Sequence, residues 1–197
     1  VVDNLSTGDP EQLPPGIDLE TIDITDRPSV VRVLAAYQPE CVFHFAGSIV
    51  VPDSVIHPLE YYQNNTVASH GLISACLDSE IRKFVFSSTA AVYGHPDSLP
   101  VDVQGALAPI NPYGASKLMT EIMLRDTAKA HQFHYAILRY FNVAGADPAG
   151  RCGQRNLKAT HLIKIACEAA IGLRDGVTIF GDDYETHDGT CIRDFIH

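Results

Sequence analysis

Strand-like and helix-like segments alternate along most of this chain, and this alternation constrains the fold more than any other feature. Four runs of strand-forming residues are separated by helical patterns, with strands at 19–23, 41–46, 83–88 and 135–139 and helices at 28–37, 58–77 and 112–131. Such alternation at regular spacing is typical of a parallel sheet covered by helices, so we predict the α/β fold class. The run at 41–46 is apolar nearly throughout, which predicts a strand buried on both faces.

The chain changes character after Asn142, where a stretch rich in Gly and Ala follows at 145–153. A helical pattern at 160–172, a short strand at 177–180 and an acidic turn come next. We therefore predict a boundary that gives domains at 1–142 and 143–197. Because the chain has no initiator Met and stops within an apolar run at His197, we expect it to be a piece of a longer protein.

The composition excludes several classes of protein. With a formal net charge of −10 at pH 7, the chain has no broad electrostatic footprint for nucleic acid or for an anionic membrane. No apolar stretch approaches the length of a membrane span. The five cysteines are odd in number and none has C-x-x-C spacing. This usage argues against disulfides and a metal site, and it favours a reducing cytoplasm.

Two segments follow expected strands at the edge where parallel sheets bind ligands. Asp3-Asn4 follows Val1-Val2, and a carboxylate at that place in a dinucleotide-binding fold hydrogen-bonds the adenosine ribose. The glycine-rich phosphate loop would then precede Val1 by this count. Phe45-Ala46-Gly47 ends another strand, and a glycine there lets the backbone approach a ligand closely. Taken alone, an ordinary turn explains either segment.

A third segment combines Tyr113 and Lys117 with the Ser/Thr-ended strand that closes on Thr89. Tyr and Lys four residues apart lie on one face of a helix, and the ammonium would favour the phenolate. A hydroxyl at the strand end could bridge to a substrate alcohol, which makes a relay suited to oxidising that alcohol by hydride transfer. The alternative is a surface lysine beside a packing tyrosine.

These residues lie within seven stretches that resemble the extended short-chain dehydrogenase/reductase family, in its branch of NAD-dependent epimerases and dehydratases. The stretches are VVDNLSTG at 1–8, HFAG at 44–47, PLEYYQNN at 58–65, FVFSSTAAVYG at 84–94, NPYGASKLMTE at 111–121, LRYFNVAGADP at 138–148 and IFGDDYETHDGTCIRDFIH at 179–197. The resemblance implies a Rossmann-type, doubly wound parallel sheet whose first βα unit is missing here. It also implies that a smaller C-terminal substrate domain begins after Asn142.

The resemblance further implies epimerisation at C4 of a UDP-hexose, between UDP-glucose and UDP-galactose, with bound NAD and a transient 4-keto sugar. Tyr113 would be the catalytic acid–base, Lys117 would hold the nicotinamide ribose, and Thr89 would contact the sugar 4-hydroxyl. The full-length protein would be a homodimer that serves galactose metabolism in the cytoplasm. Lacking the phosphate loop, the chain as given would be inactive, aggregation-prone and poor at binding NAD.

Other site residues are implied in the same way. The cofactor would contact, besides Tyr113 and Lys117, the residues Asp3, Asn4, Asp23, Ile24, Phe45, Ala46, Asn64 and Tyr140. The UDP-sugar would contact, besides Thr89, the residues Phe141, Asn142, Leu162, Phe180 and Arg193, the last at the diphosphate. The chain departs from the family pattern at Ile49, where a lysine is common, and at His161, where a side-chain amide is common.

Two other interpretations remain open. A related UDP-sugar epimerase or decarboxylase would share these residues. Dehydratase chemistry is disfavoured, because Ala90-Ala91 follows Thr89 where those enzymes carry an Asp-Glu pair. A non-catalytic nucleotide-binding relative is the alternative from a different class; Ile49 favours it weakly, whereas the intact Thr89, Tyr113 and Lys117 oppose it.

Overall fold

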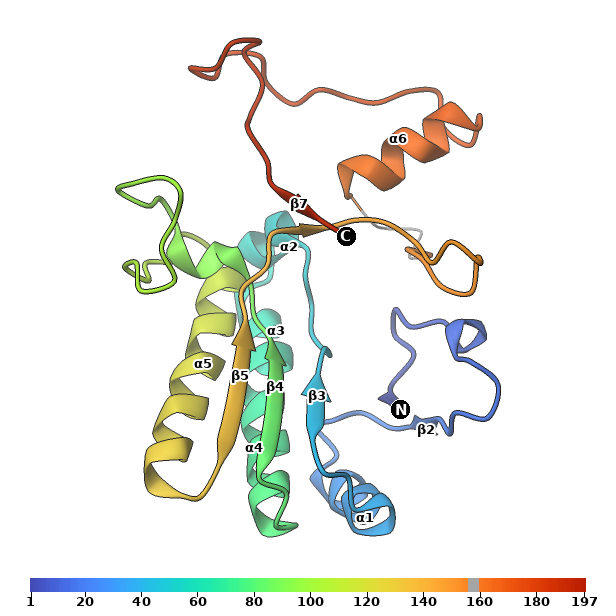
Figure 1. Ribbon diagram of the computed structural model, residues 1–197, viewed down its shortest axis with the longest axis vertical. Coiled ribbons are helices and arrows are strands. Elements are labelled where there is room, and N and C mark those ends of the chain that lie inside the picture. The colour runs from blue at the N-terminus through green and yellow to red at the C-terminus, as the bar shows by residue number, and fades with distance from the viewer. Residues whose placement is uncertain (156–159) are drawn as a thin grey trace. The chain divides into compact units, whose positions relative to one another are not determined.

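The computed structural model describes residues 1–155 and 160–197, and it confirms the α/β class with parallel sheets (Figure 1). Strands β3 (Val42–His44), β4 (Lys83–Ser87) and β5 (His134–Leu138) pair in the order β3-β4-β5. Both pairings are parallel, and His44, Phe86 and Ile137 lie opposite one another. Parallel neighbours need long crossovers, and helices supply them here.

A second parallel sheet pairs β1 (Val2–Asp3) with β2 (Glu20–Thr21), with Val2 opposite Glu20. The 3₁₀ helix η1 (Pro10–Gln12) lies between the two strands in the chain. Within the described residues, no ladder joins this pair to β3. In the Rossmann strand order 3-2-1-4-5-6, strand 1 separates strand 2 from strand 4. The two separate sheets therefore agree with a Rossmann sheet that lacks its first strand.

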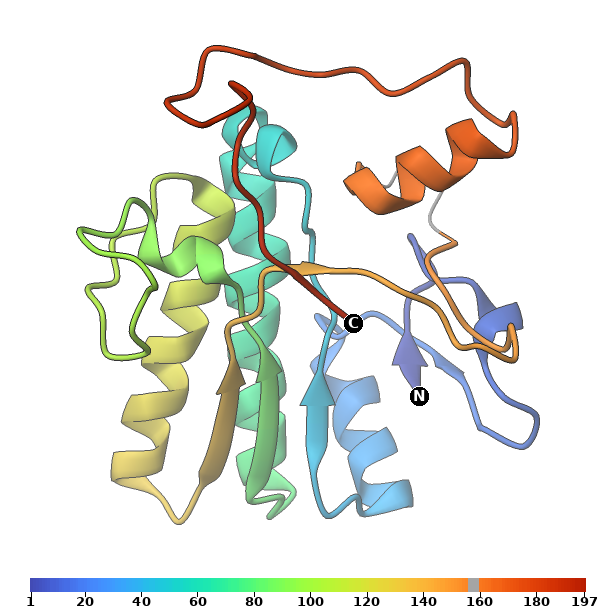
Figure 2. The same cartoon turned by 45° about the horizontal axis from the view of Figure 1, so that its top comes forward.

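Three longer helices form the crossovers: α1 (Arg27–Tyr37), α4 (Ala68–Asp78) and α5 (Pro112–Ala130). Asp26 caps α1 by accepting from the Ser29 N–H at 3.3 Å, and Asn111 caps α5 by accepting from the Gly114 N–H at 2.8 Å. Such caps satisfy N–H groups that have no partner within the helix. Figure 2 shows α4 and α5 side by side behind the β3-β4-β5 sheet.

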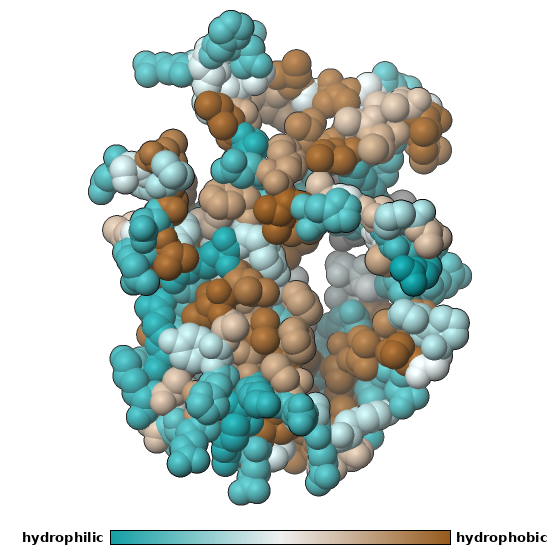
Figure 3. All heavy atoms as spheres, viewed as in Figure 1, coloured by the Kyte–Doolittle hydropathy of each residue, from teal (hydrophilic) through white to brown (hydrophobic). Residues whose placement is uncertain are grey.

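The core of the first unit lies between the sheet and these helices. It is built from large apolar side chains of both layers, chiefly Leu72, Cys76, Phe84, Phe86, Leu124 and Phe133. The opposite face of the sheet is open: Phe43 is 62% exposed, whereas its neighbour His44 is buried. The prediction that 41–46 is buried on both faces is therefore wrong, because the described helices cover the side of His44. Figure 3 shows apolar side chains at the surface on this open side.

The helix predicted at 58–77 is divided. It comprises α3 (Pro58–Tyr61), the π-helix η2 (Tyr62–Val67) and α4, and the short helix α2 (Val51–Ile56) precedes it. Another short helix, the 3₁₀ helix η3 (Ala90–Tyr93), follows β4. Hydropathy alone cannot distinguish a π-turn from the α-helix around it, since the turn adds a single residue.

The chain forms two compact units, and the second comprises Asp9–Pro15 and Tyr140–His197. In it, β6 (Asn142–Val143) pairs in parallel with β7 (Phe195–Ile196), and α6 spans Leu162–Ala170. The strand predicted at 177–180 is not formed, since these residues pair with no described strand. The helix predicted from 160 to 172 is present but shorter. No helix in the described part of the chain is both long and apolar enough to cross a membrane.

Candidate active site

Helix α5 carries Tyr113 in its first turn and Lys117 one turn later, on the same face. Lys117 is only 3% exposed, and its Nζ donates to the Ser87 carbonyl at the end of β4 at 3.0 Å. The ammonium also lies 5.1 Å from the centre of the Phe86 ring. Burial lowers the pKa of Lys117 to about 8. A lysine held in this way is still charged at neutral pH and is fixed beside the sheet's C-terminal edge.

Thr89 lies at that same edge, two residues after β4 ends. Its side chain is buried, and its Oγ1 accepts from the Ala91 N–H at 3.1 Å, which caps η3. The cap uses an acceptor site of the hydroxyl and leaves its proton available for donation. The C-terminal end of β4 thus presents the Thr89 hydroxyl and, through the Ser87 carbonyl, binds the Lys117 ammonium.

The predicted adenosine residues come together at the C-terminal ends of β1 and β2. Asn4 donates from Nδ2 to Asp23 Oδ2 at 2.8 Å, and Asp3 Oδ1 accepts from the Leu5 N–H at 2.7 Å. Hydrogen bonds from Thr25 and Asn4 lower the pKa of Asp23. A Cβ on Gly8 would lie 2.7 Å from Asp3 Oδ2, so glycine there leaves room for the carboxylate. Asp3 also makes the ordinary turn that was the alternative explanation. Ile24 follows Asp23 and is half-buried.

The residues after β3 include two of the predicted cofactor residues. Phe45 and Ala46 are exposed at the end of the strand. Gly47 has a φ of 152°, and a Cβ there would lie 3.0 Å from Asn65 Oδ1 and 3.4 Å from Lys117 Nζ. A side chain at this position would crowd the lysine. The bare backbone, the carboxylates and the amides together fit a flat ligand with ribose hydroxyls, as NAD has.

Asn65 is the principal residue that the sequence reasoning missed. It is buried, and its Oδ1 accepts from the Ser48 N–H at 2.7 Å. Its Nδ2 donates to the Ser48 carbonyl and to Ser116 Oγ, each at 3.0 Å. Ser116 Oγ in turn donates to the Tyr113 carbonyl at 2.7 Å. One buried amide therefore fastens the loop after β3 to the first turn of α5. Two adjacent asparagines inside an apolar helical run were the available signal.

The predicted residue Asn64 lies beside Asn65 on the π-helix η2 and donates to Ser48 Oγ at 2.9 Å. The carbonyl of Asn65 accepts from Ser69 Oγ and, at 3.4 Å, from Thr120 Oγ1. These hydroxyls satisfy a carbonyl in the irregular turn. Ser69 Oγ also meets His44 Nε2 at 2.7 Å, and burial lowers the pKa of His44 to about 3. His44 is therefore a neutral, structural histidine.

The remaining predicted residues belong to the second unit. Asn142 donates from Nδ2 to the Asp194 carbonyl at 2.8 Å, which joins the start of β6 to the segment before β7. Tyr140 is half-buried, and the other residues are exposed: Phe141, Leu162, Phe180 and Arg193. Among the departures, Ile49 is exposed and His161 precedes α6 without capping it through its side chain. The roles of all these residues stay predictions.

Comparison with known proteins decides the family. The model of the NAD dependent epimerase/dehydratase family matches residues 1–197, that is, the whole chain. The chain belongs to the NAD-dependent epimerase/dehydratase family. Its parallel sheets are those expected of a Rossmann-type domain.

Curated relatives in the family are named UDP-glucose 4-epimerase. The protein of Azospirillum brasilense is 57% identical over 196 residues, which cover 100% of this chain and 56% of the relative. That of Rhizobium meliloti is 48% identical, with 100% and 60% covered. A crystal structure of UDP-glucose 4-epimerase from Brucella ovis in complex with NAD matches with a TM-score of 0.95 at 45% identity, again covering 100% of this chain and 60% of that one. The chain thus spans about 60% of the length of the relatives it matches.

Proposed function

We propose that the full-length protein is a UDP-glucose 4-epimerase, an isomerase that interconverts UDP-glucose and UDP-galactose in galactose metabolism. The observation that carries the proposal is the arrangement at the C-terminal edge of the sheet. There, Tyr113 and Lys117 share one face of α5, and Lys117 is bound to the end of β4 that leads to Thr89. Epimerisation at a secondary alcohol needs a proton acceptor and a hydride acceptor together.

In this mechanism Tyr113 takes the proton of the sugar 4-hydroxyl. It later returns the proton to the same oxygen, when C4 has the opposite configuration. The buried ammonium of Lys117 stabilises the phenolate by its charge. Thr89 orients the 4-hydroxyl by a hydrogen bond. NAD, when bound, would accept the hydride from C4 and give it back to the other face of the 4-keto sugar. No oxidant is consumed, since hydride and proton both return to the substrate.

NAD would be held by two groups of residues. Asp3, Asn4, Asp23 and Ile24 would bind its adenosine end, as their carboxylates and amides suit ribose hydroxyls. The nicotinamide end would meet Phe45, Ala46, Asn64, Tyr113, Lys117 and Tyr140. The close packing of Gly47 on Asn65 and Lys117 supports this assignment, because it leaves backbone where a side chain would obstruct the ligand.

The UDP-sugar would contact Thr89, Phe141, Asn142, Leu162, Phe180 and Arg193. A planar guanidinium such as that of Arg193 suits a diphosphate, and an aromatic ring such as that of Phe180 suits a uracil. Residues 1–142 would then form the NAD-binding domain, and 143–197 the beginning of the UDP-sugar domain. Ile49 would leave the cofactor without the contact of a lysine at this position, and His161 would put an imidazole where the family pattern has a side-chain amide.

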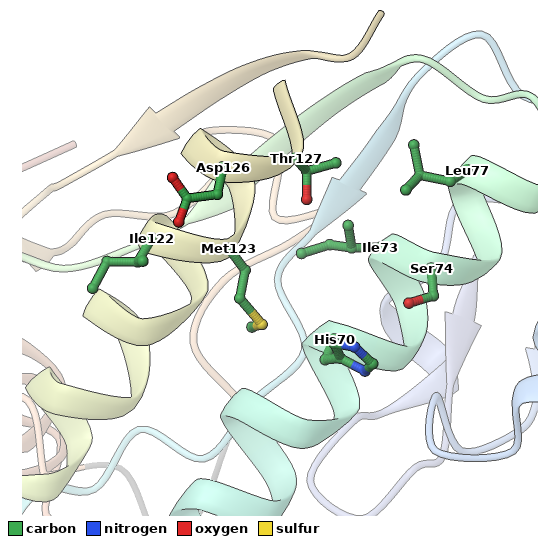
Figure 4. A pocket seen from close by; sticks show the side chains of 8 residues that line it. All are labelled: His70, Ile73, Ser74, Leu77, Ile122, Met123, Asp126 and Thr127. Carbon is green, nitrogen blue, oxygen red and sulfur yellow. The ribbon is translucent and has the colours of Figure 1, made fainter. Parts of the chain in front are cut away.

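We also propose that the full-length protein is a homodimer and that it works in the cytoplasm. Figure 4 shows a groove between α4 and α5 that is lined by Ile73, Leu77, Ile122 and Met123, with His70 and Asp126 at its sides. Met119 and Ile122 of α5 are exposed and Leu77 of α4 is half-buried, and such apolar side chains suit an interface in which each copy presents the same face. Light scattering of the full-length protein would give twice the chain mass; a monomer at micromolar concentration would contradict this state.

The experiment that tests the function is conversion of UDP-galactose by purified full-length protein supplied with NAD, followed by chromatography of the sugar nucleotides. We expect UDP-glucose to accumulate to equilibrium. Protein that binds NAD yet leaves UDP-galactose unchanged over hours would contradict the proposal and favour a non-catalytic relative.

A second sugar specificity is supported by one comparison. The UDP-Glc/GlcNAc 4-epimerase from Campylobacter jejuni matches with a TM-score of 0.81 at 50% identity, covering 100% of this chain and 61% of that one. Assaying UDP-N-acetylgalactosamine and a UDP-pentose beside UDP-galactose would separate an epimerase restricted to UDP-hexoses from a broader one. Release of carbon dioxide from a UDP-uronic acid would identify a decarboxylase.

A further inference from the structure

A fully buried carboxylate on α5 takes no part in the mechanism described above. Glu121 is 0% exposed. Its Oε1 accepts from Ser88 Oγ at 2.5 Å and from Arg139 Nε at 2.9 Å. Its Oε2 accepts from Arg139 Nη2 at 2.7 Å and from Arg125 Nη2 at 2.8 Å. The carboxylate is therefore saturated by four hydrogen bonds, two of them from the fork of one guanidinium.

The partners of Glu121 lie on elements that surround Thr89. Ser88 precedes Thr89 directly, and its N–H donates to the Leu138 carbonyl of β5 at 2.9 Å. Arg139 follows β5, and its Nη1 donates to the Tyr93 hydroxyl of η3 at 2.9 Å. The guanidinium also lies 5.1 Å from the centre of the Tyr93 ring. The segment from Ser88 to Tyr93, with Thr89 inside it, is thus held at both ends by one ion pair.

This ion pair is expensive to bury, so its presence needs a reason. Burial raises the pKa of Glu121, but hydrogen bonds from Arg139 and Ser88 outweigh it, and the pKa lies below its ordinary value. A buried ion pair can often be replaced by apolar side chains without loss of stability. What apolar side chains cannot supply is a set of directional bonds from α5 to the ends of β4 and β5. The network therefore fixes geometry more than it adds stability.

The geometry in question is that of the proposed proton transfer. Tyr113 and Glu121 are eight residues apart on α5, about 12 Å along the axis at 1.5 Å per residue. Since Glu121 is also fully buried, it cannot touch a substrate bound at Tyr113. It can, however, fix the strand end that carries Thr89 relative to the helix that carries Tyr113.

We infer that Glu121 is a positioning residue, which acts through Ser88 and Arg139 to hold the Thr89 hydroxyl at its working distance from Tyr113. The inference rests on the proposed function for its catalytic consequence. A misplacement of about 1 Å at a reacting group can cost about 10²-fold in rate. Loss of this carboxylate is therefore expected to lower kcat and leave KM for the UDP-sugar and the NAD content nearly unchanged.

The experiment compares Glu121→Gln, Ser88→Ala and Arg125→Ala in the NAD-loaded full-length protein. Arg125→Ala is the matched control, since Arg125 binds the same carboxylate but touches neither the strand end nor Tyr93. We expect kcat to fall about 10²-fold in Glu121→Gln and about tenfold in Ser88→Ala, and by less than twofold in Arg125→Ala. If Glu121→Gln fails to fold, the comparison of kcat between Ser88→Ala and Arg125→Ala tests the inference alone. Equal losses in Ser88→Ala and in the control would overturn the inference.

A double-mutant cycle with Thr89→Val separates positioning from a general loss of structure. If Glu121 acts through Thr89, adding Glu121→Gln or Ser88→Ala to Thr89→Val should cost less than twofold more, because the group being positioned is already absent. Full additivity of the losses would overturn the inference.

Hydrogen exchange makes the test independent of the proposed function. Amides of 88–93 should exchange faster in Glu121→Gln and Ser88→Ala than in Arg125→Ala or the unmodified protein. Faster exchange in a protein that converts no UDP-sugar would reject the function and keep the positioning role. Unchanged exchange would reject the positioning role whatever the activity.

Discussion

The two compact units of this chain hold their candidate site residues in different ways. In the first, Lys117, Asn65, Ser88 and Glu121 are buried and joined by short hydrogen bonds to neighbouring strands and helices. In the second, no described residue is buried, and α6 exposes Leu162 and Ile163. The difference indicates that the geometry around Lys117 and Thr89 depends on a packed core, whereas the proposed UDP-sugar residues of the second unit depend on local turns and one short ladder.

In the first unit, the proposed acid–base can be removed without removing its ring. Tyr113→Phe should lower kcat by about 10²- to 10⁴-fold, because a positioned acid–base is lost while the ring remains. KM for UDP-galactose should change little. Steady-state kinetics of the full-length protein measures both, and near-normal turnover would show that Tyr113 is not the acid–base.

A pair of identical substitutions tests the packing contrast directly. Leu124→Ala should lower the free energy of unfolding by about 2–5 kcal/mol, since Leu124 is fully buried against the sheet. Leu162→Ala should change it by less than about 0.5 kcal/mol, because Leu162 is 52% exposed. Urea unfolding midpoints of the two variants provide the measurement. Similar shifts for both would remove the contrast between the units.

The buried lysine predicts a dependence of stability on pH. Lys117 has a folded pKa of about 8 and an ordinary value of 10.5. Between these values the unfolded chain binds more protons than the folded one, so stability should rise with pH in this window. Relative to Lys117→Met, the NAD-free protein should gain up to about 3 kcal/mol from pH 8 to 10.5.

Urea unfolding of both proteins across this pH range isolates the contribution of Lys117, since other groups titrate alike in each. A flat difference between them would mean that the ammonium stays charged throughout.

An exposed aromatic ring of the second unit can be removed with little effect on stability. Phe180 is 88% exposed, so Phe180→Ala should leave the free energy of unfolding unchanged within about 0.5 kcal/mol. If its ring stacks on uracil as proposed, KM for UDP-galactose should rise roughly fivefold to tenfold at constant kcat. An unchanged KM would remove Phe180 from the substrate site.

Hydrophobic periodicity was sufficient to predict the strands and helices of the first unit. The spacing of Tyr113 and Lys117 was sufficient to predict that they share one helix face. Hydrophobic periodicity was not sufficient at β3. Whether Phe43 is buried depends on which helices cover the sheet, and the hydropathy of one strand does not contain that information. Asn65 and Glu121 were missed for a similar reason, because their importance comes from partners about 20 to 50 residues away, Ser48, Ser88, Ser116 and Arg139. Val177–Phe180 has the composition of a strand but pairs with no described strand.

The π-helix η2 has a consequence for how one long helix serves two neighbours. One extra residue rotates everything after it by about 100° around the axis, since an α-helix has 3.6 residues per turn. Ahead of the insertion, Tyr61 faces the loop after β3 and binds Val50. Beyond it, Leu72 and Cys76 face the hydrophobic core. The π-turn therefore sets the rotation of the second half of the helix relative to the first half. Removing one residue from the turn would rotate either the Tyr61 face or the Leu72 face away from its partner.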